Sequence, residues 1–181
     1  MFQGCSSLSE IESLQNWNVK NCEDFEFMFQ GCKSLTNING LKNWNVSKGE
    51  GFDAMFEGCE LLSDIRALEN WDVSNGNNFE SMFSECSSLS DIKPLEKWNV
   101  SNGSNFMGMF SKCSSLSDIT PLENWDVSNG LGFNFMFSEC SSLKKLQKWN
   151  VQNGKGFEDM FVDCSLLKDS EINELFEKWK I

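Results

Sequence analysis

The chain has 181 residues and a formal charge of −12. Such an acidic chain repels phosphate backbones, which disfavours nucleic-acid binding and attraction to acidic membrane surfaces. Histidine is absent, so the Cys-His, Ser-His and imidazole-metal arrangements used in hydrolytic and metal-assisted chemistry are missing. We therefore expect no catalytic residues, no metal site and no cofactor.

One sequence unit recurs along nearly the whole chain. A Met-Phe pair marks each unit, at intervals of 27 residues and finally of 24. The units start near Met1, Met28, Met55, Met82, Met109, Met136 and Met160. Tryptophan, phenylalanine and seven of the eight cysteines keep the same spacing, which is typical of a tandem repeat array. We assign residues 1–168 to the repeat solenoid and residues 169–181 to a separate C-terminal segment.

The first half of each unit has helical periodicity. In "FESMFSECSSL" the apolar residues fall at i, i+3, i+4, i+7 and i+10, namely Phe79, Met82, Phe83, Cys86 and Leu89. This spacing predicts one apolar face of a helix, with Asn78 as an acceptable N-cap. A second, shorter helical or irregular segment is expected around Pro94, because proline is tolerated in the first turn of a helix.

The second half of each unit changes to a period of two. In "KWNVS", Trp98 and Val100 share one face, which predicts a short strand with both side chains facing inwards. The Asn102-Gly103 pair that follows predicts a turn. One unit buries too little to fold alone, so successive units must stack. The prediction is a right-handed α/β solenoid of about seven units, with short parallel strands on one face and helices on the other.

The C-terminal segment "KDSEINELFEKWKI" departs from the repeat. Its apolar residues Ile172, Leu175, Phe176 and Trp179 fall at i, i+3, i+4 and i+7, with Ser170 as a possible N-cap. We expect a C-terminal capping helix within residues 169–181 that covers the last core face. The first unit has no matching cap, so we expect that end to meet further units, a partner or a second copy.

The set "MFxxCxxL…WxVSN" resembles BspA-type leucine-rich repeats, in particular the Met-Phe-containing branch of mycoplasma-type and other microbial surface proteins. The resemblance covers roughly residues 1–168. It implies a curved repeat solenoid without catalytic residues, used in adhesion and protein recognition at cell surfaces. The start of the chain shows no export signal, and no apolar stretch reaches 18 residues, so we expect no membrane insertion.

The cysteine row has three interpretations: metal ligands, disulfides or buried thiols. No CxxC motif and no histidine accompany it, and parallel stacked side chains do not point at one another. Buried thiols acting as small hydrophobes are therefore favoured, which suits a reducing compartment. Cys22 replaces the turn glycine of other units, so we predict seven protected thiols and one exposed thiol, at Cys22. The tryptophans are interpreted as core rather than as sugar-stacking platforms.

Outward-facing polar residues form a predicted binding strip. Its central row is Asn18, Asn45, Asp72, Asn99, Asp126 and Asn150, and it is flanked by Lys97 and Lys148. Repeat proteins use such extended faces to bind partners. The alternative is a hydrogen-bonded Asn/Ser ladder that only aids stacking. Asn45, Asn99 and Asn102 also match the N-glycosylation pattern, and glycans there would crowd the strip.

These observations predict a non-enzymatic protein-binding module, a surface adhesion or recognition segment that engages a protein through its polar face. An intracellular scaffold or a self-assembling structural repeat protein is the alternative. It is suggested by the free cysteines and the missing export signal. The sequence does not identify the partner.

Overall fold

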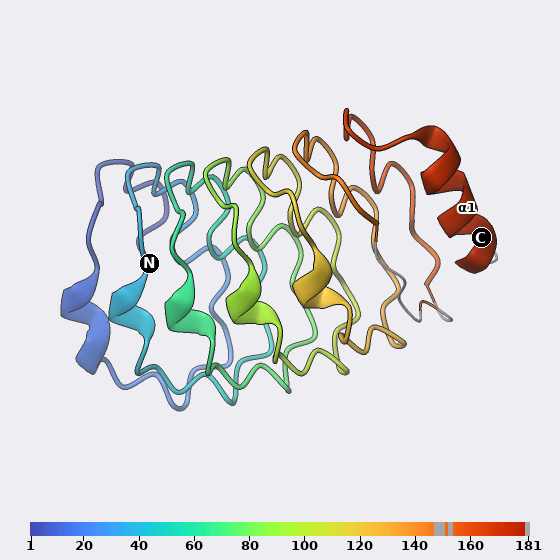
Figure 1. Ribbon diagram of the computed structural model, residues 1–181. Helices are drawn as coiled ribbons and strands as arrows, with labels where there is room; N and C mark the ends of the chain where they lie inside the picture. The colour runs from blue at the N-terminus through green and yellow to red at the C-terminus, as the bar shows by residue number, and fades with distance from the viewer. Residues whose placement is uncertain (147–150, 152–153, 180–181) are drawn as a thin grey trace.

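The computed structural model describes residues 1–146, 151 and 154–179. The chain winds into an elongated stack of similar turns and ends in one α-helix (Figure 1). Five turns carry a short 3-10 helix at equivalent positions along one side of the stack (Figure 1). The elements are η1 (Glu12–Asn16), η2 (Asn39–Leu41), η3 (Arg66–Leu68), η4 (Lys93–Leu95), η5 (Thr120–Leu122) and α1 (Asp169–Trp179). The predicted solenoid is therefore confirmed, while its right-handed coiling stays a prediction.

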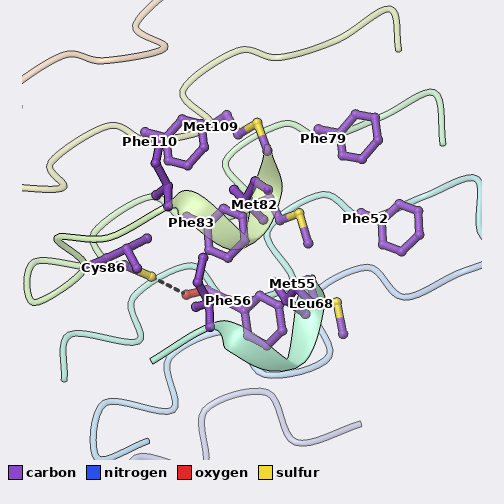
Figure 2. Close-up of a cluster of buried hydrophobic side chains, with 14 of the residues drawn as sticks. Phe52, Met55, Phe56, Leu68, Phe79, Met82, Phe83, Cys86, Met109 and Phe110 are labelled. Atoms are coloured by element: carbon purple, nitrogen blue, oxygen red, sulfur yellow. Dashed lines mark hydrogen bonds between the residues drawn. The ribbon is translucent and has the colours of Figure 1, made fainter. Parts of the chain in front are cut away.

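Identical aromatic side chains stack on one another along the solenoid. The Phe83 ring centroid lies 5.6 Å from that of Phe56 and 5.6 Å from that of Phe110. A second column runs through Phe52 and Phe79, whose ring centroids are also 5.6 Å apart. All these rings are 0% exposed, and Figure 2 shows methionine side chains between the two columns. Because a single unit would leave both faces of each ring open, stacking is what completes the core.

The predicted long helix over Phe79–Leu89 is wrong. This segment runs through successive tight turns, with left-handed φ values of 53° at Ser81 and 62° at Glu85. The Phe83 N–H donates to the Met109 carbonyl of the next unit at 2.9 Å, and its neighbours two residues away bond in the same way. A helix would instead use these groups within its own segment. The apolar spacing identified the inward side chains but did not distinguish a helix from stacked turns.

The predicted strand around Trp98 and Val100 is also wrong, and the described residues contain no continuous strand. The N–H groups of this segment donate within their own unit: the Trp98 N–H bonds the Leu95 carbonyl at 3.1 Å, and the Ser101 N–H bonds Asn99 Oδ1 at 3.1 Å. Parallel bridges between units form elsewhere. They join Asp24–Gly51, Asn37–Asp64, Gly51–Asn78, Asn78–Asn105, Asn105–Gly132 and Gly132–Gly156.

The shorter helical segment is confirmed as a 3-10 helix. Pro94 is buried in the first turn of η4, where its missing N–H leaves no acceptor unsatisfied. The C-terminal helix is confirmed as α1, although Ser170 lies inside its first turn rather than at its N-cap. The Phe176 ring centroid is 6.3 Å from that of Phe161, so α1 packs on the core of the last unit.

Candidate functional site

The central row of the predicted strip lies on the surface at equivalent positions of successive units. Its exposed members are Asn18, Asn45, Asp72, Asn99 and Asp126. Lys97, beside the row, is exposed, and its Nζ lies 3.5 Å from a carboxylate oxygen of Glu69. Lys148 and Asn150 lie outside the described residues. From Asn45 to Asp126 each member stands between a buried Trp and a buried Val, which turns it outwards, and the 27-residue repeat sets the spacing of the row.

Each described member of the row uses one oxygen to hold its own turn. Asn99 Oδ1 accepts the Ser101 N–H at 3.1 Å, and Asp126 Oδ1 accepts the Ser128 N–H at 3.1 Å. Such Asx turns fix the chain direction after the buried Trp-Asx-Val segment. The Ser128 hydroxyl and N–H bonds lower the pKa of the Asp126 carboxyl, because they favour its charged form.

In the described members of the row, the second polar side-chain atom does not take part in these turns. No described residue bonds the Nδ2 atoms of Asn45 and Asn99 or the Oδ2 atoms of Asp72 and Asp126. From Asn45 to Asp126 the row therefore alternates an amide donor with a carboxylate acceptor, and Asn18 places a second amide before Asn45. Both kinds of atom suit hydrogen bonding to a polypeptide partner.

A neighbouring asparagine row ties the units together. Asn102 Nδ2 donates to the Ser74 carbonyl of the preceding unit at 2.7 Å, and Asn129 Nδ2 donates to the Ser101 carbonyl at 2.8 Å. This is the Asn/Ser ladder of the alternative interpretation, but it lies three residues beyond the central row. Stacking through asparagine is thus carried by this second row.

The buried cysteines are hydrogen-bonded core groups. Cys86 Sγ donates to the Phe56 carbonyl of the preceding unit at 3.2 Å (Figure 2), and Cys113 Sγ donates to the Phe83 carbonyl at 3.1 Å. Burial raises the pKa of Cys86 well above its ordinary value and that of Cys113 to about 12. These thiols are held neutral, which opposes both nucleophilic and metal-binding chemistry.

The prediction of seven protected thiols is correct for six. The buried thiols are Cys32, Cys59, Cys86, Cys113, Cys140 and Cys164. Cys22 is exposed as predicted, but Cys5 is exposed as well. Cys5 belongs to the first unit, where no preceding turn covers it. Exposure of a repeated residue therefore depends on its unit as well as on its position within the unit.

Tryptophan follows the same rule. Trp44, Trp71, Trp98 and Trp125 are 4% to 5% exposed, which confirms their core role. Their indole N–H groups donate to leucine carbonyls of the preceding unit, as Trp98 does to Leu68 at 2.9 Å. Sequence reasoning missed this bond, although a buried indole N–H requires an acceptor.

A pocket of about 470 Å³ lies between the last unit and α1. Apolar side chains of Phe161, Ile172 and Phe176 line it together with the carboxylate residues Asp159 and Asp163. The sequence analysis did not anticipate this pocket, because it depends on how far α1 stands from the last turn.

Within the described residues no cluster of Cys, Asp and Glu could hold a metal ion. Nor is any helix in the described part of the chain long and apolar enough to cross a membrane.

A model of the family described as "Mycoplasma protein of unknown function, DUF285" matches residues 1–118 and again residues 63–179. Among solved structures, the leucine-rich repeat protein TpLRR of T. pallidum is similar with a TM-score of 0.46 and 19% identity, over 84% of this chain and 63% of that one. A leucine-rich repeat protein of Bacteroides ovatus gives a TM-score of 0.26 and 15% identity, over 71% and 43%. The chain thus spans less than two thirds of either protein. No curated protein matches it.

Proposed function

The chain belongs to the Mycoplasma family DUF285, and we propose that it is a non-enzymatic module that binds a protein partner through its central Asn/Asp row. One observation carries the proposal: the second polar atom of each described row member is not bonded by any described residue. A rigid stack holds these atoms in line, so their hydrogen bonds to a partner cost little conformational entropy. Lys97, Lys148 and Asn150 extend the proposed surface.

Display of this module on a cell surface, for adhesion or recognition, is part of the proposal and rests on the resemblance to BspA-type repeats. The alternative is an intracellular scaffold, favoured by six buried free thiols and the absence of disulfides among the described cysteines. Labelling of intact cells with a membrane-impermeant reagent separates the two. A full-length product that is never labelled contradicts the adhesion reading and leaves the binding role to be tested separately.

Isosteric swaps test the row without removing its turns. The double variant Asn99→Asp with Asp126→Asn keeps both Oδ1 acceptors and the net charge, but exchanges the outward donor and acceptor. Each swap replaces a matched contact with a repulsive or unpaired one, so we expect partner affinity to fall about tenfold or more. A protein captured by the native chain is titrated against the native chain and against the variant, and the two affinities are compared.

The matched control is Asn173→Asp with Glu177→Gln, the same chemistry on exposed positions of α1. We expect the control to bind as the native chain does, and both variants to keep the native melting temperature. Undiminished binding by the Asn99/Asp126 variant would contradict the proposed surface. A lowered melting temperature of that variant alone would show that the row is structural.

A further inference from the structure

The hydrogen-bond ladder between units has a direction. Alternate N–H groups of each turn segment donate towards the next unit, and alternate carbonyls accept from the previous one. In the unit before the last, the N–H groups of Phe133, Phe135, Phe137 and Glu139 donate over 2.6, 3.0, 2.9 and 2.7 Å. Their acceptors are the carbonyls of Gly156, Glu158, Met160 and Val162. The carbonyl row of the last unit is therefore fully engaged.

The N–H row of the last unit is not. The equivalent donors belong to Phe157, Asp159, Phe161 and Asp163, and none of these N–H groups bonds a described residue. The backbone keeps its ladder conformation here, with φ of 52° at Asp159 and 59° at Asp163 against 58° at Phe135 and 59° at Glu139. Because the conformation repeats, the unbonded N–H groups point out of the C-terminal end of the ladder.

The open pocket beside α1 is lined by three of these four donor residues. Helix α1 covers the aromatic core, with Trp179 5.6 Å from Phe157 between ring centroids, but it does not close the ladder row. These unbonded backbone donors at the open pocket are free to bond the acceptors of a ligand in exchange for water. Three carboxylates, of Asp159, Asp163 and Asp169, line the same pocket and disfavour an anion as the acceptor. A neutral acceptor with adjacent positive charge fits both conditions.

We propose that this end of the solenoid binds a basic segment of a partner polypeptide, which takes up the same series of tight turns and forms one more rung of the ladder. Its alternate carbonyls accept the N–H groups of the last unit, as the carbonyls of each unit do for the unit before it, which is the turn counterpart of backbone augmentation at a sheet edge. Its cationic side chain lies beside Asp163, and apolar side chains contact Val162 and Ile172. This site is separate from the Asn/Asp row.

The chain itself supplies the pattern that such a segment should have. We count the positions of a turn segment from its leading phenylalanine, which is Phe106 in the unit that contains Lys112. Lys112 is then the one lysine at a seventh position, and its Nζ lies 2.8 Å from Glu85 of the preceding unit. Asp163 occupies the same position in the last unit. A segment with the sequence of residues 105–116, "NFMGMFSKCSSL", bound in the same register, would set its lysine against Asp163.

A synthetic peptide of residues 105–116 is the probe, and amide hydrogen exchange measured by NMR is the readout. In the native chain, we expect the Phe161 and Asp163 amides to exchange faster than those of Phe137 and Glu139. Saturating peptide should slow them by at least about tenfold, because each gains an acceptor. Amides already protected without peptide, or peptide binding that leaves them unprotected, would overturn the proposal. Protection by inorganic phosphate in place of peptide would replace it with an anion site.

A charge exchange tests the register. We expect the peptide with Lys112→Glu to bind the native chain at least about fivefold more weakly. The Asp163→Lys variant should reverse this preference. Lysine is compatible with the left-handed backbone there, because Lys112 has φ of 60° at the equivalent position. If the Asp163→Lys variant melts like the native chain but still prefers the peptide with lysine, the proposed register is wrong. If the variant does not fold, the amide exchange experiment on the native chain decides whether the site exists.

Discussion

The middle units and the first unit carry the same residues in different surroundings. Phe83 is stacked on both sides and is 0% exposed, whereas Phe2 is half-buried and stacks on one phenylalanine, Phe29, at 5.4 Å. Trp98 is 4% exposed and Trp17 is 40% exposed. The comparison shows that a repeated residue becomes core only where a neighbouring unit lies against it.

Alkaline pH should have the largest effect on the difference between the covered middle units and the open first unit, because it acts on the buried thiols. Burial raises the pKa of Cys32 and Cys164 to about 11, that of Cys59 and Cys113 to about 12, and that of Cys86 and Cys140 further above the ordinary value of 9.0. Because the pKa of each buried thiol is higher in the folded than in the unfolded chain, raising the pH above 9 favours the unfolded chain, whose thiols ionise first. The stability contributed by the neutral buried thiols is therefore fully present below pH 9 and is lost as the pH rises from 9 through 11 and 12. We expect the chain to unfold within that pH window. The urea concentration at the midpoint of unfolding, measured as a function of pH, follows this loss.

Two variants check the cause of the alkaline loss. Cys113→Ala should reduce the pH dependence by about one proton, because one buried thiol no longer ionises on unfolding. Cys5→Ser with Cys22→Ser removes only exposed thiols and should leave the pH dependence unchanged. Thiol labelling of the native chain at neutral pH should give two fast-reacting groups, and fast reaction of all eight thiols would contradict the buried row.

Removing one ring from the column should have the next largest effect. Phe83→Ala leaves a cavity between two stacked phenylalanines, so we expect a loss of about 3–5 kcal/mol in the free energy of unfolding. Phe2→Ala removes a half-buried ring with one stacking partner and should cost roughly 1–2 kcal/mol. Chemical denaturation measures both. Equal losses would show that the first unit is as well packed as the middle.

A smaller effect isolates the indole hydrogen bond. Trp98→Phe retains an aromatic ring but leaves the Leu68 carbonyl without its indole donor, so we expect a loss of about 1–3 kcal/mol from the unmet acceptor and the smaller ring. The Trp17 ring is 40% exposed, and its indole N–H bonds no carbonyl of the described residues. Trp17→Phe should therefore change stability by less than about 0.5 kcal/mol. A comparable loss in both variants would mean that the inter-unit bond adds nothing.

Three local expectations were confirmed because they depended on the chemistry and spacing of neighbouring residues alone. Pro94 fits only the first turn of a short helix, and η4 places it there. The i, i+3, i+4, i+7 spacing of Ile172, Leu175, Phe176 and Trp179 needed no partner strand, and α1 formed over it. The outward position of Asn99 likewise followed from its place between the inward residues Trp98 and Val100.

The hydrogen bonding of the turn segment could not be predicted in the same way. Helical spacing and a series of tight turns both bring every third or fourth residue to one side, so the Phe79–Leu89 pattern is compatible with either. Left-handed φ at Ser81 and Glu85 is unusual for residues other than glycine. The sign in the sequence lay in other units, where glycines stand at the equivalent positions and also have positive φ: Gly108 for Ser81, and Gly4, Gly31 and Gly58 for Glu85. The same uncertainty hid the directed N–H row that ends in the pocket beside α1.

By itself, the amino-acid sequence determined the period of the array, the inward and outward rows, the helix that closes its last unit and the absence of histidine chemistry. Only the tertiary structure decided which backbone groups pair between units, which copies of Trp, Phe and Cys are core, and where donors remain unpaired. The physical reason is that near-identical units share one local pattern, while burial and hydrogen bonding belong to the interface between two units.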